Sequence, residues 1–340
     1  MTRRAKRLLI ALGISAFVSL AAVAWFFIAG PGSRGERPPS TYGIHESHPG
    51  DLQANVDRTD NVRNYGLPQD LPYTFKTNSL GFRGDEVEAI GRPKVLVLGD
   101  SFVFGMGVNN DQTFPAYLEL ALRANGYPQS KVYNGGVPGY TVTDLEEQWV
   151  DKLSEFSADW VILCHNGSDI KEMARPYSLR RMMRYDAMNP ERNDPDIRRL
   201  IGDSGGRENA IRSHFIFRED DLWRRLGSDL ARVKPLRDRY TAGVLRLAEK
   251  VRSTGARFSV VLWVRKYTLG GLEVAPLRDA LEAGGIPVFD GEAAMHSQSS
   301  VAAADLYLPD RHFSADGNRI AANQTADWLR ASNNALERGQ

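Results

Sequence analysis

From residue 94 onwards, short apolar segments alternate with longer amphipathic ones. The short segments have the length and the β-branched composition of strands, and the longer ones carry apolar residues at helical spacing. The expected strands are KVLVL at 94–98, KVYN at 131–134, DWVILC at 159–164, RFSVVLWV at 257–264 and IPVFD at 286–290. Apolar strands that alternate with helices predict an α/β domain, in which helices cover both faces of a parallel sheet.

Local signals mark the ends of the helices between these strands. Thr113 is the expected N-cap of the first helix, and Gly126 is expected to end it. A second helix is expected over 143–156, with Thr143 and Glu146 as its capping box. A final helix is expected to follow the last strand and to close the domain.

One connection is much longer than the others. Residues 171–239 separate the third expected strand from the fourth and mix many arginines with many acidic residues. Connections in α/β units are usually only a few residues long. This segment is therefore either a helical insertion with a solvated, salt-bridged surface or a lid or wall beside a ligand site, since insertions at the carboxyl edge of a sheet shape that site.

The N-terminus combines a cationic start with a long uncharged span. Residues 8–30 carry no charged side chain, and about 20 apolar residues suffice to cross a bilayer as a helix. Cations before the span predict that the rest of the chain is exported. A cleaved signal peptide is the alternative, with an A-x-A motif at 22–24, but the apolar run continues through Phe27 and favours an uncleaved anchor.

These features divide the chain into three parts. Residues 1–30 are expected to form a basic tip and a single-pass anchor in the inner (cell) membrane, and residues 31–92 a linker with a short irregular or β prelude. The main domain is expected over 93–333, with the insertion at about 171–239. The main domain would then lie in the periplasm or outside the cell.

Composition excludes some classes of partner and cofactor. The net charge of +1 argues against a nucleic-acid-binding protein. Cys164 is the only cysteine, which excludes an intramolecular disulfide, and its apolar neighbours predict a buried thiol. No further cluster of metal ligands accompanies His45 and His48, and histidines are common in loops. We therefore expect no metal, no cofactor and no nucleic-acid partner.

Polar and glycine-rich residues gather where the expected strands end. Parallel α/β sheets bind ligands beyond the carboxyl ends of their strands. Ser101 follows the first strand, NGGVPGY at 134–140 the second and CHNGSD at 164–169 the third, while Asp310 and His312 precede the last helix. A serine hydroxyl becomes a good nucleophile only when a base takes its proton, and a histidine held by a carboxylate is such a base. A phosphate-binding loop after the first strand is a weaker reading, since the Walker ending and the dinucleotide glycine spacing are both missing.

The order and surroundings of these segments resemble the SGNH/GDSL hydrolase family. GDSFVFGMGV at 99–108 is similar to the first block of that family, NGGVPGY to the second and PDRHFSADGN at 309–318 to the last. The preceding TNSLGFRG at 77–84 is similar to the lead-in of extracytoplasmic bacterial members. The resemblance implies a flavodoxin-like three-layer α/β/α sandwich and ester cleavage by a serine, with Ser101 as nucleophile, His312 as base and Asp310 as its orienting carboxylate.

The resemblance also implies an oxyanion hole. Its donors would include the backbone N–H groups of Ser101 and Gly136. The third block of the family normally reads Gly-x-Asn-Asp, but HNGSDI places Ser168 where that asparagine belongs, and Asn166 lies two residues earlier. The remaining donor is therefore expected from Ser168 or Asn166.

Together these features predict a membrane-attached serine esterase outside the cytoplasm. Its expected substrate is an acyl ester, most simply an acetyl ester, on an envelope glycan or a small molecule. An O-acyltransferase of the same fold that modifies an exported polysaccharide is the alternative, because both reactions pass through the same serine ester. A non-catalytic glycan-binding protein is a second alternative, which Ser168 favours and the intact Ser101, Asp310 and His312 oppose.

Overall fold

The computed structural model describes residues 51–61, 71–174, 199, 202, 230–263, 274–298 and 305–338. The expected anchor and most of the expected insertion lie outside these ranges. Within them, no helix combines the length and the apolar character that a membrane span requires.

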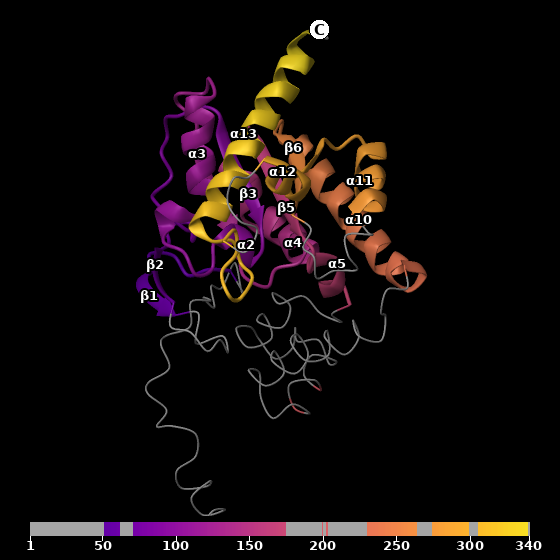
Figure 1. Cartoon of the computed structure of the whole chain (residues 1–340), viewed down its shortest axis with the longest axis horizontal. Helices are drawn as coiled ribbons and strands as arrows, with labels where there is room; N and C mark the ends of the chain where they lie inside the picture. The colour runs from indigo at the N-terminus through magenta and orange to yellow at the C-terminus, as the bar shows by residue number, and fades with distance from the viewer. Residues whose placement is uncertain are drawn as a thin grey trace, which may run out of the picture. The chain divides into compact units, whose positions relative to one another are not determined.

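Five parallel strands form the central sheet (Figure 1). They are β3 (Lys94–Gly99), β4 (Lys131–Gly136), β5 (Trp160–Asn166), β6 (Arg257–Trp263) and β7 (Val288–Asp290). The order β4-β3-β5-β6-β7 is that of flavodoxin-like doubly wound folds. It confirms the predicted α/β class with a central parallel sheet. The order reverses beside β3, and the crevice at such a switch point is where open α/β sheets bind ligands.

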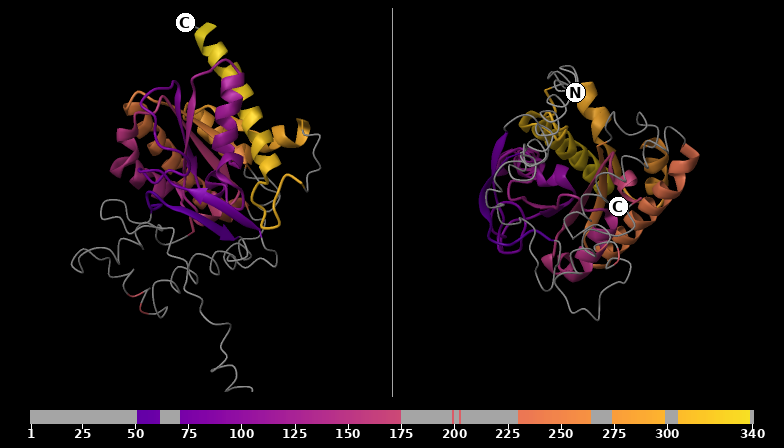
Figure 2. Two further views of the ribbon diagram at one scale, coloured as in Figure 1. Left: turned by 90° about the vertical axis from the view of Figure 1, so that its left-hand side faces the viewer. Right: turned by 90° about the horizontal axis from the view of Figure 1, so that it is seen from below.

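Helices pack on both faces of this sheet (Figures 1 and 2). One face carries α3 (Phe114–Ala124), α12 (Gly291–Gln298) and α13 (Ala315–Arg338), and the other carries α4 (Val142–Asp151), α10 (Leu230–Ser253) and α11 (Val274–Ala283). Successive side chains of a strand point to opposite faces. Accordingly, Leu96 and Leu98 join the core under α4 and α10, whereas Val95 and Val97 join the core under α3 and α13.

Two of the predicted helix starts have different outcomes. Helix α3 begins as predicted, with Thr113 as its N-cap. Helix α4 begins at Val142, and its capping box is Thr141 with Asp144 rather than the predicted Thr143 with Glu146. Glu146 instead accepts two hydrogen bonds from Arg246 of α10, at 2.9 and 2.8 Å. Its carboxylate therefore binds another helix and does not cap α4.

A short antiparallel pair precedes the sheet. It consists of β1 (Asp57–Asn61) and β2 (Pro72–Lys76); β2 matches the β-like run expected in the prelude, and β1 was not predicted. After β2 the chain passes the outer edge of β4, where the Arg83 N–H donates to the carbonyl of Asn134 at 3.2 Å. This contact covers part of the edge strand, which would otherwise expose unpaired backbone groups.

Candidate active site

Strand β3 delivers Ser101 to the switch point of the sheet. The strand ends at Gly99, Asp100 is the N-cap of the short helix α2 (Ser101–Phe104), and Ser101 is the first residue of that helix. Asp100 Oδ1 accepts a hydrogen bond from the Phe102 N–H at 3.0 Å. The first N–H groups of a helix have no acceptor within the helix, so the Ser101 N–H lies at the sheet edge without an acceptor in α2.

The structure brings Ser101, His312 and Asp310 into one hydrogen-bonded line. His312 Nε2 lies 2.8 Å from Ser101 Oγ, and His312 Nδ1 lies 2.8 Å from Asp310 Oδ2. With Nδ1–H donating to the carboxylate, Nε2 presents its lone pair to the serine hydroxyl. This is the arrangement of a nucleophile, a base and the carboxylate that orients the base.

Contacts around His312 fix its position. The backbone N–H of His312 donates to Asp310 Oδ1 at 3.1 Å, and the backbone carbonyl of His312 accepts from the Leu308 N–H at 2.7 Å. The imidazole packs against the ring of Phe102, with 4.9 Å between centroids. The helix that carries Ser101 therefore also supplies a surface against which its partner histidine rests.

Gly136 has a different role from the predicted one. Its N–H donates to Asn134 Oδ1 at 3.0 Å, and both residues are buried. This N–H thus has an acceptor within the chain, and the structure does not support Gly136 as an oxyanion donor. A β-carbon at Gly136 would lie 2.3 Å from the Phe104 nitrogen and 2.7 Å from the Val103 carbonyl carbon, so the missing side chain permits close packing of β4 against α2.

Asn166 and Ser168 are hydrogen-bonded to each other beside the site. Ser168 N–H and Oγ both donate to Asn166 Oδ1, each at 2.6 Å. Because Oδ1 accepts these bonds, Nδ2 of Asn166 is directed to Asp100 Oδ2, to which it donates. The two candidates for the remaining oxyanion donor therefore belong to one network, which ends on the residue that precedes the serine.

Three carboxyl groups, one of them from the residue before Ser101, lie close together. Asp100, Asp169 and Glu172 each place an oxygen within 4.8 Å of the others. Asp169 accepts from the Tyr240 hydroxyl at 3.3 Å, and Glu172 Oε1 lies 3.2 Å from Ser168 Oγ. Burial, and then the charges of Asp169 and Glu172, raises the pKa of Asp100 to about 8. Ser101 thus follows an acidic group whose pKa is raised above its usual range by burial and by neighbouring carboxylates.

Comparison with known proteins agrees with this geometry. Among protein-family models, that of the GDSL-like lipase/acylhydrolase family matches residues 97–320. The chain belongs to this family. The match begins within β3 and ends in α13, and so includes Ser101, Asp310 and His312. A search of curated proteins finds no match.

Several solved structures are similar to this GDSL-family chain. A protein assigned to the G-D-S-L family of lipolytic proteins from Desulfitobacterium hafniense DCB-2 is 17% identical, with 69% of this chain and 99% of that chain covered and a TM-score of 0.40. The acetylxylan esterase Axe2 from Geobacillus stearothermophilus is 17% identical, covering 71% and 94%, with a TM-score of 0.41. The hydrolase LAE5 from the metagenome of Lake Arreo, Spain, is 14% identical, covering 71% and 96%, with a TM-score of 0.43.

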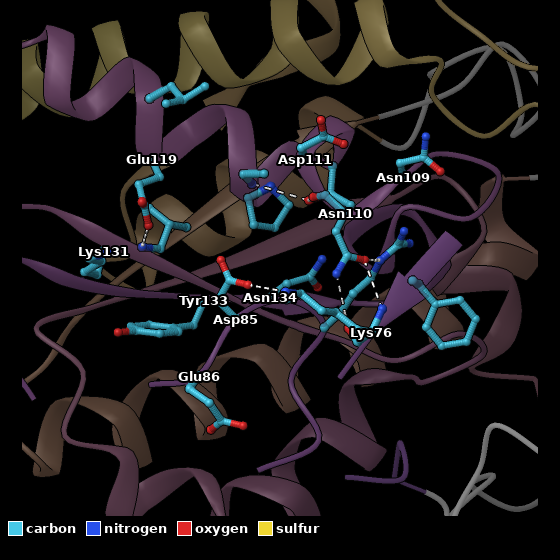
Figure 3. A pocket seen from close by; sticks show the side chains of 18 of the residues that line it. Lys76, Asp85, Glu86, Asn109, Asn110, Asp111, Glu119, Lys131, Tyr133 and Asn134 are labelled. Atoms are coloured by element: carbon cyan, nitrogen blue, oxygen red, sulfur yellow. Dashed lines mark hydrogen bonds and ion pairs between the residues drawn. The ribbon is translucent and has the colours of Figure 1, made fainter. Parts of the chain in front are cut away.

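A separate pocket lies between α3, β4 and the segment that follows β2 (Figure 3). It has a volume of about 630 Å³, and Ser101, Asp310 and His312 are not among its lining residues. Several of its charged side chains pair with one another, as Lys76 does with Asp85 at 2.6 Å. This pocket is therefore distinct from the site that Ser101, His312 and Asp310 form.

Sequence reasoning did not identify the two residues that bind the carbonyls at the C-terminal end of α2. Asn134 Nδ2 donates to the carbonyls of Val103 and Phe104 at 2.8 and 3.2 Å, and Arg83 donates to the carbonyls of Phe104 and Gly105 at 2.8 and 2.6 Å. Both residues lie in segments that resemble family blocks, TNSLGFRG and NGGVPGY, and this position was the only signal that could have singled them out.

Proposed function

We propose that this GDSL-family protein is a serine esterase with Ser101 as nucleophile, His312 as general base and Asp310 as the residue that orients His312. The observation that carries the proposal is the continuous line from Ser101 Oγ through His312 to Asp310, with both hydrogen bonds at 2.8 Å. A serine, a histidine and a carboxylate in this geometry form the constellation that acyl transfer requires.

In the proposed reaction, Ser101 Oγ attacks the ester carbonyl carbon while His312 Nε2 takes the hydroxyl proton. The tetrahedral intermediate collapses when the bond to the alcohol oxygen breaks and His312 returns the proton to the departing alcohol. Water then attacks the acyl-Ser101 ester, His312 takes a proton from the water, and Ser101 Oγ regains a proton as the acid leaves. The Asp310 carboxylate stabilises the imidazolium in both halves.

Substitution of the nucleophile and of the base tests this proposal. We expect Ser101→Ala and His312→Ala to lower kcat on a small chromogenic acetyl ester by at least about 10³-fold, because triad members act as a unit. Circular dichroism and the thermal midpoint serve as controls for folding. Undiminished turnover by a folded Ser101→Ala protein would contradict the proposal.

For the oxyanion hole we propose the Ser101 N–H and Nδ2 of Asn166. The Ser168 hydroxyl has one hydrogen, which its bond to Asn166 Oδ1 uses. Nδ2 of Asn166 has two hydrogens, of which one is directed to Asp100. Counting donors therefore favours Asn166 over Ser168.

The same esterase assay separates these two donors. Loss of one oxyanion donor costs about 10²–10³ in kcat, so we expect Asn166→Ala to lower kcat by that factor with little change in KM. Ser168→Ala is the matched comparison and should retain kcat within about fivefold, since oxyanion-type losses exceed that value. A larger fall for Ser168→Ala than for Asn166→Ala would reverse the assignment.

We further propose that the substrate is an acyl ester, most simply an acetyl ester, of an envelope glycan. This step rests on the sequence-based expectation that the enzyme works outside the cytoplasm. Transfer of the acyl group to a polysaccharide hydroxyl is the alternative, because an alcohol can replace water in the second half-reaction. Product analysis with an acetyl donor, in the presence and absence of glycan, distinguishes free acetate from an acetylated acceptor.

For location, we propose a single-pass anchor in the cell membrane with the hydrolase domain outside. The support is the cationic start followed by the uncharged residues 8–30. Fractionation should recover the full-length chain with the membrane, and protease added to spheroplasts should degrade its hydrolase domain. Recovery of a shortened, soluble chain would instead indicate signal cleavage.

A further inference from the structure

Arg83 is a buried arginine that binds carbonyl oxygens instead of a carboxylate. Only 4% of its surface is exposed, and charged side chains are almost never so buried unless they are paired. Its hydrogen-bond acceptors in the described part of the chain are four backbone carbonyls and one side-chain amide oxygen. The acceptors are the carbonyls of Phe104, Gly105, Val108 and Thr74, and Asn110 Oδ1.

Three of these carbonyls belong to the end of helix α2 and the turn that follows it. Nη1 of Arg83 donates to Phe104 at 2.8 Å and to Gly105 at 2.6 Å, and Nη2 donates to Val108 at 2.5 Å. The last carbonyls of a helix have no donors within the helix, and a cation at that end is favourable. Arg83 therefore caps the helix whose first residue is Ser101.

The length of α2 couples its two ends. The helix has four residues, and Gly105 closes it in a left-handed conformation with φ of 86°. A displacement of its last carbonyl therefore displaces its first residue as well. Asn134 supports the same end through Nδ2, and the Arg83 N–H donates to the Asn134 carbonyl at 3.2 Å, so the two supports are joined.

The chemistry of the side chain matters in this position. A guanidinium offers five N–H donors in a rigid plane, whereas a lysine ammonium offers three on a flexible stem. The guanidinium carbon of Arg83 lies 4.6 Å from the centre of the Phe104 ring. Arg83 also lines the pocket of Figure 3, together with Asn110 and Asn134, which are labelled there. Burial lowers the pKa of Arg83 to about 9, so the group is charged at neutral pH.

We propose that Arg83 is a positioning residue for the nucleophile: its guanidinium holds the carbonyls at the end of α2 and thereby fixes Ser101 relative to His312. The inference rests on the proposed role of Ser101. It adds a residue 16 positions before the start of GDSFVFGMGV, in a segment that has no role in the proposed reaction.

The test compares Arg83→Lys and Arg83→Met with a matched control, Arg58→Met. The guanidinium carbons of Arg83 and Arg58 both lie over the Phe75 ring, at 5.6 and 5.3 Å from its centre, but the guanidinium of Arg58 pairs with Asp60. Each purified full-length protein is treated with a fluorophosphonate; long incubation counts the reactive serines, and the rate of labelling measures their reactivity. Ester hydrolysis is then expressed as kcat per counted site, with KM determined in parallel.

We expect kcat per site and the labelling rate to fall together, by about 10-fold in Arg83→Lys and about 100-fold in Arg83→Met, since misplacement by about 1 Å costs 10²-fold. KM of the Arg83 variants should change less than about twofold, because only the geometry of the reacting serine is altered. The control Arg58→Met should keep the original kcat. A merely structural role would lower the number of sites and leave kcat per site unchanged, which would overturn the inference. If Arg83→Met does not fold, Arg83→Lys carries the test alone.

Ser101→Ala in the same assay keeps the two proposals apart. Retained turnover by Ser101→Ala would reject the nucleophile assignment itself. An inactive Ser101→Ala together with Arg83 variants of unchanged kcat per site would reject only the role of Arg83.

Discussion

Asp100, the residue before Ser101, is a helix cap and also has a raised pKa. It accepts from the Phe102 N–H and from Asn166 Nδ2 while fully buried near Asp169 and Glu172. Its pKa rises from 3.8 to about 8 on folding. Between these values the folded chain holds a proton that the unfolded chain has released, so the free energy of unfolding must fall as the pH rises through this interval.

This linkage predicts the behaviour of Asp100→Asn. Asparagine is also a good N-cap, but it cannot ionise. We expect the variant to lose the downward slope in stability between pH 5 and 8, a slope of up to about 1.4 kcal/mol per pH unit for one proton. Urea unfolding at several pH values measures it. Parallel profiles for the variant and the original protein would show that Asp100 is ionised throughout.

Among the elements, the contact between β4 and α2 depends on a missing side chain. A β-carbon on Gly136 would meet backbone atoms of Val103 and Phe104 at 2.7 and 2.3 Å, whereas one on Gly135 would first meet the end of the Leu98 side chain at 2.9 Å. A side-chain methyl group can rotate away from a new β-carbon, whereas the backbone atoms of α2 can yield only if the helix itself shifts.

We therefore expect Gly136→Ala to displace α2. Overpacking of this kind costs about 1–3 kcal/mol, and ester turnover should fall more than stability alone explains, because α2 carries Ser101. Gly135→Ala is the matched control on the opposite face of the strand and should be milder in both respects. Thermal unfolding and kcat on one acetyl ester provide the comparison; equal effects of the two substitutions would refute this account.

The elements also show how far sequence reasoning reaches. The five sheet strands and the start of α3 follow from local patterns, since apolar runs and cap residues act over a few positions. The start of α4 does not, because Glu146 is taken by Arg246 from a distant helix. Strand β1 was missed as well: its sequence DRTDN is polar, and only pairing with β2 makes it a strand.

The same limit applies to the site. The identities of Ser101, Asp310 and His312 could be inferred from residue type and position, because parallel strands bring their carboxyl ends to one edge. Whether a given backbone N–H already has a hydrogen-bond acceptor depends on three-dimensional contacts, which the spacing of residues in the sequence does not reveal. The hydrogen bond from the Gly136 N–H to Asn134, and the hydrogen bonds from Arg83 to carbonyls at the end of α2 and in the turn after it, are visible only in three dimensions.

In the molecule as a whole, the fold brings residues that are far apart in the sequence together at the site. Ser101 follows β3, the first strand of the central sheet, and His312 lies in the loop before α13, 211 residues later, yet the two side chains lie 2.8 Å apart. The family match over residues 97–320 covers this entire path. From this arrangement we expect the folded chain to activate one particular serine, Ser101.

The most direct measurement is the mass and position of a fluorophosphonate adduct on the intact protein. An activated serine reacts with such a probe, whereas an ordinary serine hydroxyl does not, because its proton has no base to accept it. We expect one adduct per chain, located on Ser101 by peptide sequencing, and none in Ser101→Ala or His312→Ala. An unlabelled folded protein, or an adduct on another serine, would contradict the account.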